Sequence, residues 1–278
     1  MSDLAQLSAE LAEALATNER QYIDPRSIPT RFSLLKQFSL SGAHYRAAVQ
    51  RNEDGETLAL RLGSGVHALV LGNPVIRYPG RRAGKAWDAF ELDNADKVIL
   101  NAREWVEAQE MAFAIMRNRE AMMLLFEDTI IEERIDWTFL GRAVRSTPDA
   151  RGPSHVAELK TARTSNPAWF VRDALRMHYH CQLAFYSDAL GEVTGHTPES
   201  AYVVAVEKTP PYPVTILKLT ERAIERGRQT VRLWFEQLLQ CEASDYWPAY
   251  TESIVDFDVP DVDDAIELTI DGKRVEID

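Results

Sequence analysis

The chain has 278 residues, of which 45% are hydrophobic and 27% charged, and its formal net charge is −12. This length and composition suit a soluble globular protein that buries a core. No run of about 18 apolar residues occurs, and the acidic N-terminus lacks the basic start of a secretory signal, so we expect no membrane span and a cytoplasmic location. Two cysteines, Cys181 and Cys241, exclude a disulfide framework and a four-cysteine metal cluster.

The negative charge is concentrated at the C-terminal end of the chain. Residues 251–278 contain 10 acidic and 2 basic residues, or −8, which leaves −4 for the first 250 residues. An acidic tail of this kind is either a solubilising surface or a regulatory segment. Because the charge is separated along the chain, a basic groove for nucleic acid is still compatible with the total.

Helical periodicity dominates the first half of the sequence. Ser33 and Ser41 are placed as N-caps of short helices, and residues 73–84 form a basic loop with three arginines. The small residues around His67 would allow another backbone to approach that helix closely. Apolar residues recur at helical spacing in five segments, 3–17, 30–38, 41–50, 57–71 and 101–125.

The pattern then changes to strands separated by turns. Helices are expected at 167–190 and 220–241, and the order of elements predicts an α/β fold with a central mixed β-sheet flanked by helices. The expected strands are 128–138, 141–148, 154–162, 201–207 and 213–219. We expect one domain over 1–278, divided into an N-terminal helical region (1–56), a core (57–241) and the acidic C-terminal tail (251–278).

Two carboxylates and one ammonium are expected to converge at the middle strands. Asp149 ends one strand, and Glu158 and Lys160 lie two residues apart on the next, so both project from one face while Leu159 projects into the core. Mg²⁺ is held by one or two carboxylates with water and phosphate, and it can activate water for phosphodiester hydrolysis. Lys160 would orient or deprotonate that water. An ordinary ion pair on a strand remains the alternative, because acid–x–Lys pairs are common there.

The order of motifs resembles the PD-(D/E)XK nuclease superfamily, through Pro148-Asp149 and Glu158-Leu159-Lys160. Within it the sequence is most similar to the exonucleases related to RecE, phage lambda exonuclease and the RecB nuclease domain. Four further features agree with the resemblance: Gly63-Ser64-Gly65-Val66-His67, Glu132 before Trp137, Lys160-Thr161, and the QxxxY pair Gln182 and Tyr186. The segment from Arg82 to Trp87 is also similar to the RecE-like group, and the whole resemblance covers roughly residues 30–240.

The resemblance implies a set of metal ligands. They would be Asp149, Glu158, His67, the backbone carbonyl of Leu159 and Glu132, holding Mg²⁺ with Mn²⁺ as a substitute. A lone histidine on an apolar helix is otherwise a packed core residue, and it becomes a credible ligand only beside the two carboxylates. Glu132 is preferred over Glu133 because adjacent strand residues face opposite sides.

The expected DNA contacts lie on both sides of this set. Gln182 and Tyr186 share a helix face and would hold the scissile phosphate or the 5′ end; the alternative is a polar helix face with a half-buried tyrosine. Thr161, Arg163, Arg81 and Arg82 would contact phosphates, or be solvated surface residues. Trp169 and Phe170 would stack on bases or pack in the core.

The function implied by the resemblance is a Mg²⁺-dependent exodeoxyribonuclease acting on double-stranded DNA ends. It would digest 5′ to 3′ and leave a 3′ single-stranded tail for a single-strand annealing protein, as in phage recombination. A ring-shaped homo-oligomer and a phage or prophage origin in a bacterial host are part of this expectation. The alternatives are an endonuclease or repair nuclease with the same core, and a non-catalytic DNA-binding module.

Overall fold

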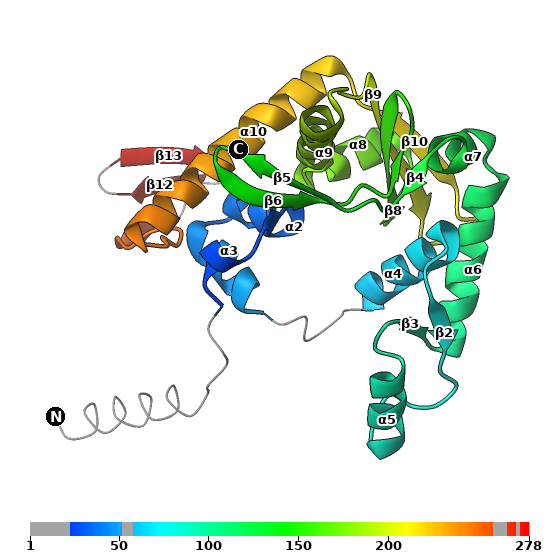
Figure 1. The fold of residues 1–278 in the computed structure, drawn as a ribbon. Helices are drawn as coiled ribbons and strands as arrows, with labels where there is room; N and C mark the ends of the chain where they lie inside the picture. Colours follow the sequence, from blue (N-terminus) through cyan, green and yellow to red (C-terminus); the bar gives the residue numbers. More distant parts are fainter. Residues whose placement is uncertain (1–22, 52–57, 258–265, 271–272, 278) are drawn as a thin grey trace, which may run out of the picture.

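The structure is a computed structural model that describes residues 23–51, 58–257, 266–270 and 273–277. The helix expected at 3–17 lies outside these residues. Figure 1 shows a central group of strands with helices around it, which confirms the expected mixed α/β architecture. In the described part of the chain, no helix is long and apolar enough to cross a membrane.

The N-terminal part of the described chain is helical with one short strand. Its elements are η1 (Pro25–Ser27), β1 (Thr30–Arg31), α2 (Phe32–Leu35), η2 (Lys36–Ser39) and α3 (Gly42–Gln50). Ser41 is confirmed as the N-cap of α3, where its hydroxyl accepts a hydrogen bond from the His44 backbone N–H. Ser33 is not a cap, because α2 begins one residue before it, at Phe32.

The middle of the chain contains the expected helix around His67 and a module that the pattern did not predict. The elements are α4 (Leu58–Leu71), β2 (Val75–Arg77), α5 (Lys85–Asp93), β3 (Val98–Leu100), α6 (Ala102–Arg117) and α7 (Arg119–Phe126). The basic loop therefore contains β2, which pairs in parallel with β3. The single helix expected at 101–125 is two helices, because Asn118 ends α6 and caps α7.

A five-stranded mixed sheet forms the centre, in the order β10-β9-β8-β7-β4. Strand β8 runs parallel to β9 and antiparallel to β7, while β1, β6 and β5 form a second, smaller sheet in which β1 and β6 are parallel. The strands are β4 (Ile130–Ile131), β5 (Ile135–Phe139), β6 (Arg142–Ser146), β7 (Ala150–Arg151), β8 (His155–Ala162), β9 (Ser200–Glu207) and β10 (Val214–Lys218).

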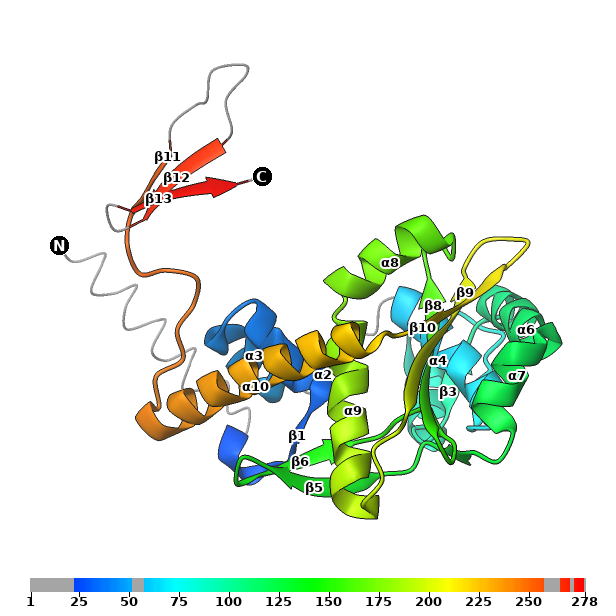
Figure 2. The same cartoon turned by 90° about the horizontal axis from the view of Figure 1, so that it is seen from above.

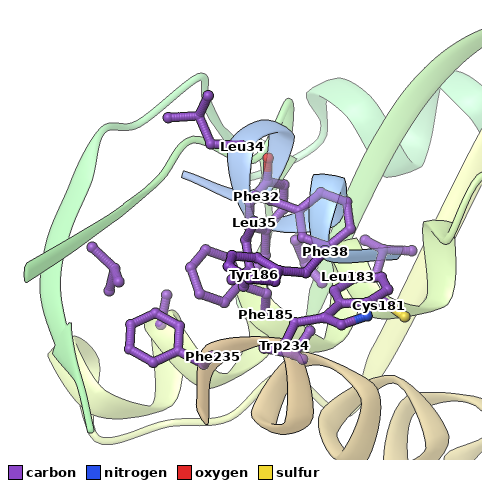
Figure 3. Close-up of a cluster of buried hydrophobic side chains, with 14 of the residues drawn as sticks. Phe32, Leu34, Leu35, Phe38, Cys181, Leu183, Phe185, Tyr186, Trp234 and Phe235 are labelled. Carbon is purple, nitrogen blue, oxygen red and sulfur yellow. The ribbon is translucent and has the colours of Figure 1, made fainter. Parts of the chain in front are cut away.

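Each face of the central sheet is covered by a separate apolar cluster. Val156 packs on the side of α9 (Tyr179–Thr194) and α10 (Glu221–Ser244), whereas Leu159 packs on the side of α4, α6 and α7. Figure 2 shows these two groups of helices on opposite sides of β8 and β9. In Figure 3, Phe32 and Phe38 from the N-terminal part meet Phe185 of α9 and Trp234 of α10.

Two differences from the expected elements affect the surroundings of the site. The segment expected as one helix at 167–190 is divided into α8 (Pro167–Arg176) and α9, because His178 takes a left-handed conformation with φ 59°. The acidic C-terminal segment contains strands β11 (Val255–Phe257), β12 (Ile266–Ile270) and β13 (Lys273–Ile277), which form an antiparallel sheet.

Candidate active site

Asp149 and Glu158 come together across the β7–β8 hairpin. The Asp149 carboxylate accepts a 2.7 Å hydrogen bond from the Leu159 backbone N–H, and Glu158 accepts one of 3.2 Å from the Asp149 backbone N–H. Both side chains are withdrawn from solvent, with 8% of Asp149 and 2% of Glu158 exposed. The Asp149 carboxylate is thus bound by the backbone next to Glu158, and the Glu158 carboxylate is bound by the backbone of Asp149. These two hydrogen bonds fix the orientation of the carboxylates relative to each other.

Lys160 and two residues of α9 complete one side of this pair. The Lys160 ammonium donates to Glu158 Oε2 at 2.6 Å, and the Gln182 amide donates to the same oxygen at 3.0 Å. Gln182 Nε2 also lies 3.1 Å from the Tyr186 hydroxyl. Glu158 and Lys160 therefore share the sheet face that α9 covers, and Leu159 is fully buried on the opposite face, as strand alternation predicts.

His67 approaches the other side of Asp149 from α4. Its Nδ1 lies 3.6 Å from Asp149 Oδ1. Small residues allow this approach: a Cβ at Gly63 would lie 3.3 Å from the Thr161 hydroxyl, and one at Gly65 would lie 2.7 Å from the Leu100 side chain. Neighbouring segments therefore pack closely on α4, as expected, but through the side chains of strands and not through their backbone.

Glu132 and Glu133 have different partners. The Glu132 backbone N–H donates to the Asp149 carbonyl at 3.1 Å, and its carboxylate accepts from the Asn73 amide. Glu133 forms an ion pair with Arg151 instead. The two residues follow β4 in a bend rather than lying within a strand, and Glu132 has a left-handed backbone with φ 46°. Of the two, the structure brings Glu132 toward Asp149.

Burial controls the protonation of the site. It lowers the pKa of His67 to about 4, with the positive charge of Lys160 acting in the same direction, so the imidazole is neutral at pH 7. Burial raises the pKa of Asp149 to about 6 and, together with the Asp149 charge, that of Glu158 to about 7. Burial opposes the charge of Lys160, but Glu158 and Asp149 outweigh it and raise the pKa of Lys160, which keeps it an ammonium.

The residues around Asp149 have the donor types that a hard divalent cation uses. A carboxylate and a neutral imidazole face each other, and the Leu159 carbonyl lies against the His67 ring. Within the described residues, no three acidic, histidine or cysteine side chains already form a cluster that could hold a cation. Glu158 Oε2 accepts hydrogen bonds from Lys160 and Gln182. A cation fits the donor set provided that Glu158 or Glu132 contributes an oxygen.

A cleft of about 410 Å³ opens beside the carboxylates, on the side of Lys160. Four of its lining side chains are cationic, and none of the described residues that line it is acidic. Its lining residues are Arg31, Phe32, Ser33, Lys36, Arg145, Thr147, Lys160, Met177, Tyr179, Gln182 and Tyr186. The cleft therefore presents positive charge and hydroxyl groups next to the buried carboxylates, which suits phosphate groups.

Comparison with known proteins identifies the family of this chain. Residues 31–257 match the family model of the PDDEXK-like domain of unknown function (DUF3799). The chain belongs to this family. The resemblance to the PD-(D/E)XK superfamily is thereby confirmed, and the family match spans both the carboxylates and the basic cleft.

One solved structure agrees with this assignment at the level of the fold, and a second is reported beside it as a similarity only. A putative exonuclease from Eubacterium rectale is 16% identical, with 85% of this chain and 90% of that chain covered and a TM-score of 0.62. An alkaline exonuclease from Laribacter hongkongensis is 17% identical, with 67% and 94% covered and a TM-score of 0.30. No curated protein matches the chain.

Only some of the residues expected to contact DNA in this PDDEXK-like protein line the cleft. Gln182 and Tyr186 line the cleft, and Thr161 is half-buried next to α4. Arg163 is exposed and lies 3.6 Å from Asp173. Arg81 is exposed on the loop before α5, apart from the cleft. Arg82 is turned inward: its guanidinium pairs with the buried Glu104 at 2.8 Å and donates to the Ile99 carbonyl, so its role there is structural.

Three cleft cations were missed in the site predicted from the sequence. Arg31 and Lys36 are more than 100 residues from Asp149 in the sequence, and nothing in their spacing points to a site. They reach it because β1 pairs in parallel with β6, which sets Arg31 beside Arg145. Arg145 flanks the core hairpin in the sequence, where it could hold a phosphate, but only the parallel pairing of Thr30–Arg31 with β6 links it to Arg31.

Proposed function

We propose that this PDDEXK-like protein is a divalent-metal-dependent exodeoxyribonuclease that hydrolyses double-stranded DNA from its ends, 5′ to 3′, leaving a 3′ single-stranded tail. The observation that carries the proposal is the connection of the Asp149–His67 pair, through Glu158, to Lys160, which lines a basic cleft. A purely structural ion pair would not require a neutral imidazole on one side and a cluster of phosphate-binding groups on the other.

Asp149, His67 and the Leu159 carbonyl would hold Mg²⁺ or Mn²⁺, with Glu158 or Glu132 supplying a further oxygen. The bound cation supplies charge neutralisation of the scissile phosphate and a water of lowered pKa. Lys160 remains an ammonium, so it orients the attacking water and offsets negative charge that develops on the phosphate, instead of removing a proton. Gln182 fixes Glu158 through Oε2, which keeps that carboxylate directed toward Lys160.

The cleft favours a DNA strand that enters beside Lys160. Arg31, Lys36 and Arg145 would neutralise phosphates near the reacting bond, and the Tyr179 and Ser33 hydroxyls would donate to them. In this proposal the cleft of about 410 Å³ takes one strand, and attack occurs at an end, where the strands can separate. We infer the 5′ to 3′ polarity from the resemblance to the RecE-like and lambda-type exonucleases.

Digestion of matched linear and covalently closed circular DNA tests the activity. We expect Mg²⁺-dependent release of nucleotides from the linear form only, and loss of this activity in Asp149→Asn. The matched control is Asp24→Asn, since Asp24 is a half-exposed aspartate that pairs with Arg26, and neither residue lines the cleft. Efficient cutting of closed circles would show an endonuclease instead. Full activity in Asp149→Asn would exclude this site.

Strand-specific labels test the polarity and solution mass tests the assembly. A linear duplex labelled on one 5′ end should lose its label first, and the product should hold a 3′ single-stranded tail.

In the same proposal the protein forms a ring-shaped homo-oligomer and passes the tail to a single-strand annealing protein. A monomeric mass by light scattering under conditions of full activity would contradict the ring.

A further inference from the structure

Helix α8 presents an aromatic and basic surface that the candidate active site does not use. The two neighbouring aromatic residues at its start separate: Phe170 is 2% exposed and contacts Tyr179, whereas Trp169 is 58% exposed. The Arg172 guanidinium lies 5.1 Å from the centre of the Trp169 ring. An exposed indole flanked by arginine is the pair that stacks on nucleobases in single-stranded nucleic acid.

The charge of this surface favours a polyanion. Its charged side chains are Arg163, Arg172, Asp173 and Arg176, with a net charge of +2, in a chain whose total is −12. Arg163 and Arg176 lie 3.6 Å and 3.4 Å from Asp173, one on each side of it. Asp173 therefore holds two arginines on the surface, and Trp169 with Arg172 lies on the same helix.

The surface is continuous with the basic cleft. Helix α8 follows β8, which carries Lys160, and Met177 at its C-terminal end lines the cleft. Buried Phe170 anchors the helix to Tyr179, and the Lys160 ammonium lies 5.4 Å from the centre of the Tyr179 ring. Figure 2 shows α8 along the outer side of the molecule, next to the ends of β8 and β9. Met177 therefore joins the edge of the cleft to the C-terminal end of this helix.

We propose that the Trp169–Arg172 face of α8 is a single-stranded DNA binding surface, where an unpaired base stacks on Trp169 and phosphates contact Arg172 and Arg176. This inference rests on the proposed nuclease function and deepens it, because it places unpaired nucleotides outside the cleft. A second copy of the chain is the competing occupant, since α8 also exposes the apolar residues Val171 and Leu175. In a two-fold contact between copies this basic face would meet itself with like charges opposed, so the arginines favour DNA.

Binding of a fluorescein-labelled oligo-dT, measured by anisotropy in EDTA, tests this surface. Trp169→Ala should weaken binding about tenfold, within the range that loss of one base–aromatic stack produces, and Trp169→Phe should restore most of it. Val171→Ala is the matched control, because it removes an exposed apolar side chain that lies about 200° around the same helix from Trp169. Arg172→Gln should weaken binding and reduce its salt dependence.

An oligonucleotide with abasic residues separates stacking from phosphate contacts. Trp169→Ala and the wild type should bind it equally, whereas Arg172→Gln should still bind it more weakly. Equal binding of oligo-dT by Trp169→Ala and the wild type would overturn the inference, and so would a changed oligomeric mass of Trp169→Ala in light scattering. Because these measurements need no cleavage, they are independent of the linear-versus-circular assay that tests the nuclease function.

Discussion

Removing the charge of Asp149 should stabilise the metal-free protein at neutral pH. The pKa of Asp149 is about 6 in the folded chain against 3.8 for an ordinary aspartate, because its carboxyl is buried. The folded state therefore favours the protonated form, and this stabilisation is present below pH 3.8 and lost as the pH rises through 6. Above that pH, keeping the carboxylate charged costs ~3 kcal/mol at 1.36 kcal/mol per pH unit.

Asp149→Asn keeps the shape and the acceptor for the Leu159 N–H but removes this cost. Urea unfolding in EDTA should show the variant more stable than the wild type by up to ~3 kcal/mol at pH 8 and equally stable near pH 4. Added Mg²⁺ should stabilise the wild type and leave the variant unchanged. Asp136→Asn should show no gain at pH 8, because neighbouring Arg134 and Arg145 lower the pKa of Asp136. If Asp149→Asn is no more stable than the wild type at pH 8 in EDTA, the reasoning from burial is refuted.

Further predictions concern the cation, the ammonium and the packing of the site. Apparent Mg²⁺ affinity should rise between about pH 5 and 8 and level off above about pH 8, because the carboxyls with pKa values of about 6 and 7 must lose protons to bind the cation. Calorimetry in two buffers should show the released protons, and a pH-independent affinity would contradict this prediction. Lys160→Met should reduce the cleavage rate by roughly 10²–10³-fold while the Kd for DNA in EDTA changes much less. Gln182→Ala, which releases Glu158, should reduce metal affinity or rate by roughly 10–100-fold, measured by titration and kinetics. Gly65→Ala should destabilise the protein by about 1–3 kcal/mol in urea unfolding, because its Cβ would meet Leu100 at 2.7 Å.

The periodicity of apolar residues was enough to predict those helices and strands that bury a regular apolar face. The α4 helix and strands β8 and β9 were predicted near their true bounds, because alternation or helical recurrence is strong there. The break between α8 and α9 was missed because Met177-His178 carries no proline or glycine, and the left-handed His178 is set by packing against Trp234. The β2–α5–β3 module was missed because its strands have only three residues each.

Local geometry was likewise enough for part of the site. Asp149, Glu158 and Lys160 are joined by one hairpin, so strand alternation alone placed them together. The approach of His67 and Gln182 came from the family resemblance and not from spacing. The cationic wall formed by Arg31 and Lys36 depends on a parallel pairing between distant segments, which no local pattern reports. The roles assigned to these residues stay predictions until variants are measured.

The pairing of β1 with β6 has a consequence for how the protein is made. Thr30 pairs with Val144, which is synthesised 114 residues later. At ~5–20 residues per second, this delay is ~6–23 s. During that interval the apolar Phe32 and Leu35, which are buried in the finished fold, have no partner from α9 or α10. The nascent N-terminal segment therefore exposes these apolar side chains during synthesis. The Arg31–Arg145 wall of the cleft forms only after β6 has been synthesised, so the N-terminal segment alone does not make the phosphate-binding surface.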